Sequence, residues 1–180
     1  MSHSLYFAYG SNLLTNRLVD RCPSAQYYAS ACVDDFALEF SKNSKKDGSG
    51  KATFIPSHGQ RLYGAVFEME TSELEQLDRV ESGYYREDSF KVCLVATGTS
   101  KTVKTYIAPE KSRNPDLKPF DWYLALIVAG AMEHKLPQTV ISAYQNTRFW
   151  TDKEGKNKSD TLKLLRKAGF ESIEQVLNLK

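Results

Sequence analysis

Alternating apolar and polar positions over the first 110 residues predict a sheet built mostly of antiparallel strands. Leu5 to Ala8 is a short apolar run typical of a buried strand. Further strands are expected at 25–33, 36–41, 52–56, 61–68, 84–96 and 102–108, where aromatic and β-branched residues gather. This gives about six or seven strands, and a small barrel would close such a sheet most economically.

Polar segments between these runs predict where the chain turns. Asp34-Asp35 and Ser57-His58-Gly59 are each expected to end one strand before the next begins. Residues 42–51 contain several lysines and glycines, and they are expected to form an exposed, flexible loop.

Helical spacing appears in the middle of the chain. Residues 71–81 predict a helix in which Leu74, Leu77 and Glu81 lie on one face. Asp78 falls at the edge of that face, and Gly83 follows the helix, as glycine often does at a C-terminus. The helix is therefore expected to turn the carboxylate of Glu81 toward the core.

The last third of the chain predicts helices alone. Asp121 is expected to cap a buried helix over 122–135, and Pro137 to start another that runs to residue 146. Residues 150–159 are polar enough to be disordered, and short helices are expected at 159–167 and 172–179. The predicted fold class is α+β, a mostly antiparallel barrel with flanking helices. It is expected to be a single domain over 1–180, with a barrel core at 1–110 and a helical part at 116–180 packed on it.

Composition excludes several kinds of protein. The chain has 180 residues, 41% hydrophobic and 26% charged, which is typical of a soluble globular protein. A net charge of +2 gives no reason to expect nucleic acid or a membrane surface as partner. No signal peptide or membrane-spanning run is recognised, and the three cysteines are far apart in sequence, so a cytoplasmic protein with reduced thiols is expected. No cysteine or histidine cluster has the spacing of a metal site.

The turn Tyr9-Gly10-Ser11-Asn12 is the first candidate for chemistry. It joins the first strand to a short helix over 12–20, and glycine there would permit a positive φ. Such a turn leaves unpaired N–H groups at a helix start, where a phosphate or carboxylate can bind. The same residues also suit an ordinary strand-to-helix turn, and local chemistry leaves both interpretations open.

Glu81 is the second candidate. A carboxylate that faces a core must be hydrogen-bonded or protonated, and such a group suits general acid and base catalysis near neutral pH. The alternative is an exposed glutamate at the frayed end of a helix.

Two motifs resemble those of a known family. Phe7-Ala8-Tyr9-Gly10-Ser11-Asn12-Leu13-Leu14 looks like the signature of the γ-glutamylcyclotransferase superfamily. Leu77-Asp78-Arg79-Val80-Glu81, followed by Gly83 and Tyr85, resembles the element that carries the catalytic glutamate of that family. Lys104-Thr105-Tyr106-Ile107 is a weaker match to a strand with a substrate-contacting tyrosine. The helices over 122–146 are most similar to the branch that gives the superfamily its name. The Ser82-Gly83 turn is shorter than in some relatives.

The resemblance implies an enzyme that cyclises γ-glutamyl amino acids and releases 5-oxoproline and a free amino acid. It implies Glu81 as general acid and base, no cofactor, no metal and no partner beyond a small γ-glutamyl substrate, and it allows a homodimer because some relatives form one. Alternatives are a cyclotransferase for γ-glutamyl amines or glutathione, and a non-catalytic binding module of the same fold. The substrate-binding residues that it implies are Tyr6, Phe7, Ala8, Tyr9, Gly10, Ser11, Asn12, Tyr85 and Tyr106.

Overall fold

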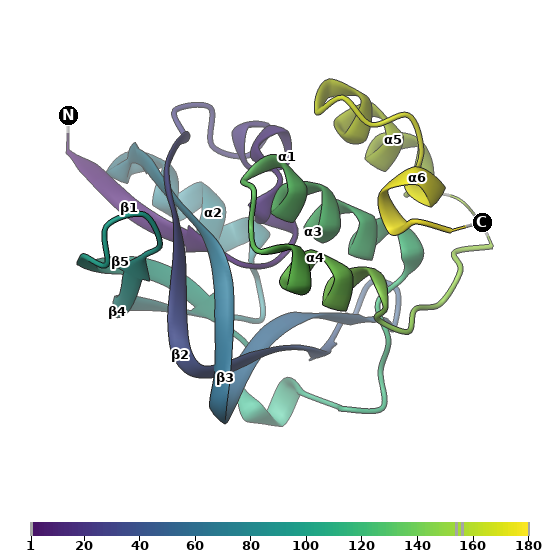
Figure 1. Cartoon of the computed structure of the whole chain (residues 1–180), viewed down its shortest axis with the longest axis horizontal. Coiled ribbons are helices and arrows are strands. Elements are labelled where there is room, and N and C mark those ends of the chain that lie inside the picture. Colours follow the sequence, from purple (N-terminus) through teal and green to yellow (C-terminus); the bar gives the residue numbers. More distant parts are fainter. Residues whose placement is uncertain (1, 154, 156, 180) are drawn as a thin grey trace.

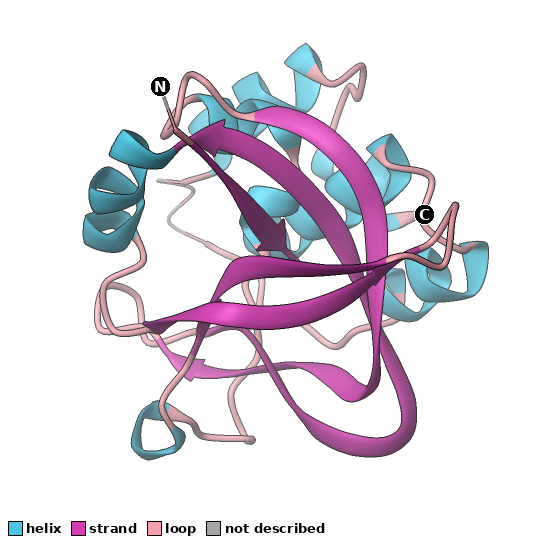
Figure 2. Cartoon of the chain, turned by 90° about the vertical axis from the view of Figure 1, so that its left-hand side faces the viewer, coloured by secondary structure: helices cyan, strands magenta, loops and turns pink. Residues whose placement is uncertain are grey.

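Five strands form a closed barrel in the computed structural model, which describes residues 2–153, 155 and 157–179. Their order around the barrel is β1-β3-β2-β4-β5, and every neighbouring pair is antiparallel except β1 and β5, which close the barrel in parallel. Figure 2 shows the strands curving around this closed sheet, with helices placed around its outside. The predicted fold class is confirmed. The strands are β1 His3–Ala8, β2 Gln26–Asn43, β3 Gly50–Glu70, β4 Tyr85–Leu94 and β5 Ser100–Ile107.

Phenylalanine rings from four strands fill the interior of the barrel. Phe54 packs edge-on against Phe36 at a centroid distance of 5.2 Å and lies 5.1 Å from Phe90. Phe7 stacks on Phe90 from the opposite side and is fully buried. Because alternate residues of a strand point to opposite faces, the neighbours of these rings remain available for other surfaces.

The prediction of six or seven strands is wrong, because two expected turns lie inside long strands. Asp35 has a φ of 61° and Gly59 a φ of 75°, and the pairing register of β2 and β3 shifts between Asp34 and Phe36. Asp35 and Gly59 lie opposite each other on the two strands, since the amide of Gly59 donates to Oδ1 of Asp35 at 2.8 Å. They form a bulged bend that curves a continuous hairpin without ending either strand.

The segment 42–51 also differs from its prediction as an exposed loop. Lys42 pairs with Lys51 at the end of the hairpin, and the intervening turn is held by Asp47, which accepts hydrogen bonds from Ser49 and Lys51. Gly50 has no room for a side chain, because a Cβ there would lie 1.9 Å from the carbonyl oxygen of Phe40. The segment is thus an internally bonded turn with buried positions.

Helix α3 (Asp121–Glu133) contacts the three other C-terminal helices, of which the two over 158–167 and 173–177 lie on its side away from the barrel (Figure 1). Every residue from Asp121 to Ala131 is buried, as its uniformly apolar sequence predicts. None of the helices in the described part of the chain is long and apolar enough to cross a membrane. The remaining helical elements are η1 Ser11–Leu13, α1 Thr15–Val19, η2 Thr71–Glu73, α2 Leu74–Val80, η3 Glu110–Ser112, α4 Gln138–Gln145, α5 Lys158–Lys167 and α6 Ile173–Leu177.

Asp121 has a different position from the predicted one. It is the first residue of α3, after the N-cap Phe120, and its Oδ1 accepts from the amides of Trp122 and Asp152. Its Oδ2 pairs with Lys158 at 3.0 Å, so one buried carboxylate joins α3 to the start of α5. Asp152 is itself buried, which contradicts disorder at that position. Residues 154 and 156 of the segment expected to be disordered lie outside the described residues.

Candidate active site

A small pocket brings together the two stretches that the sequence singled out. The turn after β1 supplies one wall and the end of α2, with Glu81, supplies the opposite one. Tyrosine side chains from the barrel and from α3 complete the lining. The residues that line the pocket are Tyr6, Tyr9, Gly10, Ser11, Asn12, Ala52, Glu81, Tyr84, Tyr106 and Tyr123.

Close neighbours, rather than a left-handed backbone conformation, favour glycine at position 10. The φ of this residue is −98°, so Gly10 does not use the positive φ that glycine permits. A Cβ at Gly10 would lie 3.3 Å from Cβ of Ala52 and 3.7 Å from the hydroxyl oxygen of Tyr123. The carbonyl of Gly10 accepts from the amide of Leu13 at 2.9 Å. The amides of Gly10 and Ser11 have no acceptor among the described residues, which leaves both N–H groups for a ligand.

Glu81 lies at the C-terminal end of α2, where its amide donates to the carbonyl of Leu77 at 2.8 Å. Its Oε1 accepts two hydrogen bonds, from Nδ2 of Asn12 and from Nη1 of Arg21, both at 2.9 Å. The same Nη1 donates to Oδ1 of Asn12 at 2.6 Å. Only 18% of the Glu81 side chain is exposed, so it is held in the pocket and the frayed-end alternative is wrong.

Tyr6 and Tyr106 form the wall nearest the helix that carries Glu81. The hydroxyl of Tyr6 accepts from Nδ2 of Asn12 at 3.0 Å, and the two tyrosine rings pack edge to face at 5.9 Å. The hydroxyl of Tyr106 donates to Oδ1 of Asp78 at 2.7 Å. Asp78 also binds Arg86, so the carboxylate at the edge of α2 holds part of the pocket wall.

Ala52 of β3 anchors the opposite wall through its main chain. Its carbonyl accepts from the hydroxyl of Tyr84 at 2.8 Å, and its amide donates to the hydroxyl of Tyr123 at 3.1 Å. Tyr9 lies between the walls, and its hydroxyl donates to the carbonyl of Tyr106. The barrel and α3 thereby fix the tyrosines in place before any ligand binds.

The pocket favours neutral tyrosine side chains. Burial raises the pKa of Tyr6, Tyr9, Tyr84, Tyr106 and Tyr123 above the usual value of 10.0. Nearby negative charge adds to the shift, from Glu81 for Tyr6 and from Asp78 for Tyr106. These hydroxyls therefore keep their protons and act as hydrogen-bond donors or acceptors.

Three predicted substrate-binding residues are placed away from the pocket. The side chains of Phe7 and Ala8 are fully buried, and that of Phe7 points into the barrel because it alternates with Tyr6 along β1. Tyr85 is 47% exposed and does not line the pocket, while its neighbour Tyr84 does. Tyr84 precedes the first residue of β4 and lies in the turn after Glu81, where its amide donates to the carbonyl of Glu81 at 3.0 Å.

Sequence reasoning missed several residues of the site. Arg21 contacts both Asn12 and Glu81, and Arg17 donates from Nε to Oγ of Ser11 at 3.1 Å. Desolvation lowers the pKa of Arg17 to about 10, which marks a guanidinium held away from water beside the turn. Tyr123 reads in the sequence as one more apolar position of a buried helix. The positions of Tyr123, Arg17 and Arg21 in the sequence do not indicate a role in the pocket, because each reaches it only through tertiary packing.

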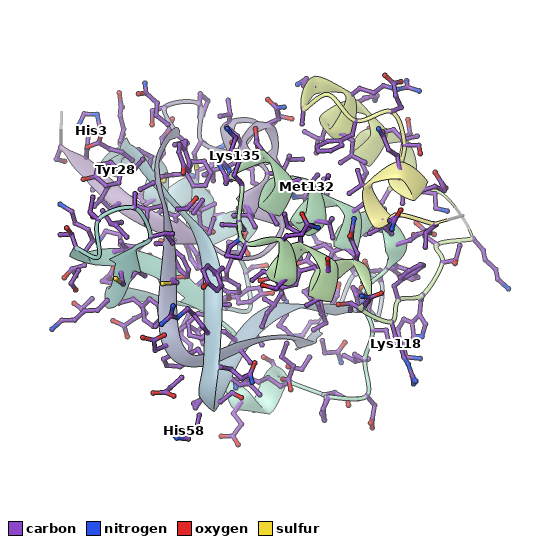
Figure 3. The ribbon with its side chains drawn as sticks, viewed as in Figure 1. His3, Tyr28, His58, Lys118, Met132 and Lys135 are labelled. Carbon is purple, nitrogen blue, oxygen red and sulfur yellow. The ribbon has the colours of Figure 1, made fainter. Side chains whose placement is uncertain are left out.

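Histidines and cysteines stay apart from the pocket. His3 and His58 lie far from each other on the outside of the barrel (Figure 3), and the side chain of His58 is fully exposed. His134 is buried with its Nε2 3.0 Å from the carbonyl of Leu13. Cys32 and Cys93, distant in sequence, face each other across β2 and β4 as free thiols. In the described residues, no group of three or more metal-ligating side chains is placed to hold an ion.

Comparison with known proteins relates the chain to a family of enzymes. A sequence model of the AIG2-like family matches residues 61–144. The human γ-glutamylcyclotransferase is 37% identical over 140 residues, which cover 74% of this chain and 72% of the human protein. The mouse γ-glutamylcyclotransferase is 38% identical over 141 residues, covering 74% and 73% of the two chains.

Solved structures give the same result. A structure described as a γ-glutamyl cyclotransferase superposes with a TM-score of 0.81 at 32% sequence identity. The match covers 92% of this chain and 99% of that one. It therefore extends over nearly the whole chain.

Proposed function

The chain belongs to the γ-glutamylcyclotransferase family, and we propose that Glu81 is the residue that moves the protons of its reaction. That reaction is the cyclisation of a γ-glutamyl compound, which releases 5-oxoproline. The observation that carries the proposal is the position of Glu81, which lies in a pocket with little solvent exposure and faces the turn at Gly10–Asn12. A carboxylate held in this way suits general acid and base catalysis.

The turn binds the glutamyl part of the substrate in this proposal. The amides of Gly10 and Ser11, which have no acceptor in the described structure, donate to the α-carboxylate. The guanidinium of Arg17 supports the same anion through its hydrogen bond to Ser11. With the carboxylate held at the turn, the γ-glutamyl chain folds back so that its own amine approaches its γ-carbonyl.

Glu81 first removes a proton from the α-ammonium group. The freed amine attacks the γ-carbonyl carbon, so that a new C–N bond closes the five-membered ring. The original amide C–N bond then breaks as Glu81 returns the proton to the departing nitrogen. The ring nitrogen loses its remaining extra proton to the released amine, which leaves as an ammonium. Proton transfer of this kind contributes about 10²- to 10⁴-fold, and alignment of the reacting groups within one molecule contributes further.

Neutral groups around the pocket stabilise the charge that develops on the γ-carbonyl oxygen. Because the amides of Gly10 and Ser11 hold the α-carboxylate, the proposed donor is a side chain that lines the pocket. The hydroxyl of Tyr6, which is bonded to Asn12, suits this role because burial and Glu81 raise its pKa and it keeps its proton. Fixed donors of this kind act without reorganisation during the reaction.

Substrate trials test the proposed activity. The protein is incubated with γ-glutamyl-alanine, γ-glutamyl-ε-lysine and glutathione, and the release of 5-oxoproline is measured. We expect release from γ-glutamyl-alanine. Release from only one of the other two would assign the chain to an amine or a glutathione branch, and release from none would contradict the proposed activity on these substrates.

A variant of Glu81 tests its role. Glu81→Gln keeps the side-chain shape and its hydrogen bonds but cannot accept the proton, so turnover should fall by about 10²- to 10⁴-fold. Glu75→Gln on the exposed side of the same helix is the matched control and should keep the wild-type rate. A Glu81→Gln variant that is folded and fully active would show that another group moves the proton.

A further inference from the structure

Lys42 places an ammonium group at the edge of the pocket. It lies near the end of β2, opposite Lys51 of β3. Its Nζ is 4.9 Å from the centre of the Tyr84 ring, and a Cβ built on Gly83 would lie 3.3 Å from the same nitrogen. Tyr84 is a wall residue, and Gly83 follows Glu81 by two positions. Lys42 therefore flanks the side of the pocket that is formed by the turn after Glu81.

Within the described part of the chain, the ammonium of Lys42 has no anionic partner, whereas the neighbouring cations of Arg21 and Lys51 do. Arg21 pairs with Glu81 at 2.9 Å and Lys51 pairs with Asp47 at 2.8 Å. Among the described residues, Nζ of Lys42 makes no hydrogen bond or ion pair, and it lies over the Tyr84 ring. Burial lowers the pKa of Lys42, and the charges of Glu81 and Asp47 oppose that shift. A carboxylate ligand would offset this desolvation.

The chemistry of the leaving group supplies such a carboxylate. In a γ-glutamyl amino acid, the nitrogen that leaves is one carbon away from a carboxylate, and in a γ-glutamyl amine that carboxylate is absent. Glu81 returns the proton to this nitrogen in the proposed mechanism, so the leaving group lies on the Glu81 side of the pocket. Lys42 borders that side.

We propose that Lys42 binds the carboxylate of the leaving amino acid and thereby makes γ-glutamyl amino acids the preferred substrates over γ-glutamyl amines. The inference rests on the proposed function and assigns a substrate class to the same pocket. Lys42 acts on specificity and takes no part in proton transfer. Because the carboxylate keeps its charge throughout the reaction, the contact strengthens substrate and transition state alike, and its loss raises KM rather than lowering kcat.

Two substrates that differ only in that carboxylate test the inference. Steady-state release of 5-oxoproline is measured from γ-glutamyl-alanine and from γ-glutamyl-alaninamide, in which a neutral amide replaces the carboxylate. For Lys42→Met, KM for γ-glutamyl-alanine should rise by about 10- to 100-fold, the range expected for losing a charged hydrogen bond. KM for γ-glutamyl-alaninamide should stay within about twofold of the wild-type value, because that substrate makes no such contact.

Control variants separate charge from structure. Lys42→Arg keeps the positive charge and should restore most of the preference for γ-glutamyl-alanine. Lys45→Met removes the same charge from an exposed position in the adjoining turn and should leave both substrates unaffected. Lys42 is only partly buried, so Lys42→Met should fold, and its thermal unfolding midpoint is compared with that of the wild type.

Several outcomes would overturn the inference while the proposed function stands. If Lys42→Met lowered kcat/KM equally for both substrates, Lys42 would only support the pocket wall. Unchanged kinetics, or a wild-type enzyme that shows no preference between the two substrates, would mean that Lys42 does not contact the carboxylate. If the wild type released no 5-oxoproline from either substrate, the proposed function itself would fail and the inference with it.

Discussion

At the scale of single residues, Arg21 joins the two stretches that make the site. One of its nitrogens, Nη1, donates to Oδ1 of Asn12 at 2.6 Å and to Oε1 of Glu81 at 2.9 Å. Asn12 in turn donates to Glu81, so the three side chains form a closed set of hydrogen bonds. Without the guanidinium, Oδ1 of Asn12 and Oε1 of Glu81 would each lose a donor in a place with little solvent. A buried acceptor left without a partner destabilises the folded protein by more than a hydrogen bond normally stabilises it.

Arg21→Met should therefore lower both turnover and stability. We expect kcat to fall at least about tenfold, because Glu81 loses the contact that orients it, and the free energy of unfolding to fall by about 1–3 kcal/mol. For Arg21→Lys, kcat and the free energy of unfolding should lie between those of the wild type and of Arg21→Met, since lysine keeps the charge without the planar guanidinium. Arg79→Met, at an exposed position of α2, is the control. Loss of stability without loss of kcat would make Arg21 purely structural.

The sequence predicts which stretches line the pocket better than it predicts their contacts. Glu81 and the turn at Gly10–Asn12 both line it, as their motifs indicate, and their chemical roles stay predictions. The contacts of Arg21 are not predicted, since nothing in its local sequence shows that it reaches across to the end of α2. The exchange of Tyr85 for Tyr84 has a different cause. The motif after Gly83 predicts Tyr85, and in the structure its side chain is exposed at the start of β4, while Tyr84 in the turn before it reaches the carbonyl of Ala52.

At the scale of elements, the contact between α3 and η1 sets the position of the binding turn. A Cβ on Gly130 would lie 2.5 Å from the carbonyl carbon of Leu13 and 2.5 Å from the amide nitrogen of Leu14. The helix can approach the turn this closely only because position 130 has no side chain. His134, one turn further along the chain, has its Nε2 3.0 Å from the carbonyl of Leu13. A helix remote from Gly10 in the sequence thus supports the residues that follow it.

Gly130→Ala should change substrate binding although residue 130 does not line the pocket. Alanine favours the helix by about 1 kcal/mol over glycine, but its methyl group would force the backbone at Leu13 and Leu14 to move. Overpacking of this kind typically costs about 1–3 kcal/mol, so we expect lower stability and, because Ser11 and Asn12 shift with η1, a higher KM. Urea unfolding and steady-state kinetics measure the two effects. Met132→Ala, on the outer side of α3 (Figure 3), should change neither.

The elements themselves were predicted with one systematic error. Apolar alternation identified nearly every segment of strand, and the buried helix at 121–133 followed from its composition. The count of strands failed at Asp35 and Gly59, where residues with positive φ ordinarily indicate a turn. In a small barrel the same conformations bend a long strand around a corner. Local sequence does not distinguish the two uses, because the difference lies in whether the partner strand bends at the same place.

At the scale of the whole molecule, the barrel and α3 enclose an unusual number of tyrosines. Of the ten tyrosines in the chain, six have a pKa raised above 10.0, with desolvation as the largest cause of each shift. Five of them line the pocket and the sixth, Tyr144, is in α4. The folded protein keeps protons that the unfolded chain would release, so these groups link stability to pH.

The linkage predicts a loss of stability in alkali. Below pH 10 each of these tyrosines is neutral in both states, and the full stability is present. Above pH 10 the unfolded chain ionises first, so each buried tyrosine lowers the free energy of unfolding by about 1.4 kcal/mol per pH unit until its folded pKa is reached. Arg17, Lys42 and Lys51, whose pKa values are lowered by burial, offset part of this loss.

Urea unfolding at a series of pH values from 8 to 11, with tyrosinate absorbance at 295 nm as a second signal, measures this effect. We expect the free energy of unfolding to fall steeply above pH 10 and the buried tyrosines to ionise together with unfolding. Tyr144→Phe removes one such group outside the pocket and should make the fall less steep, whereas Tyr28→Phe, at a position 43% exposed, should not. Stability that stays constant to pH 11, or ionisation of all ten tyrosines before unfolding, would contradict a pocket that holds its hydroxyls neutral.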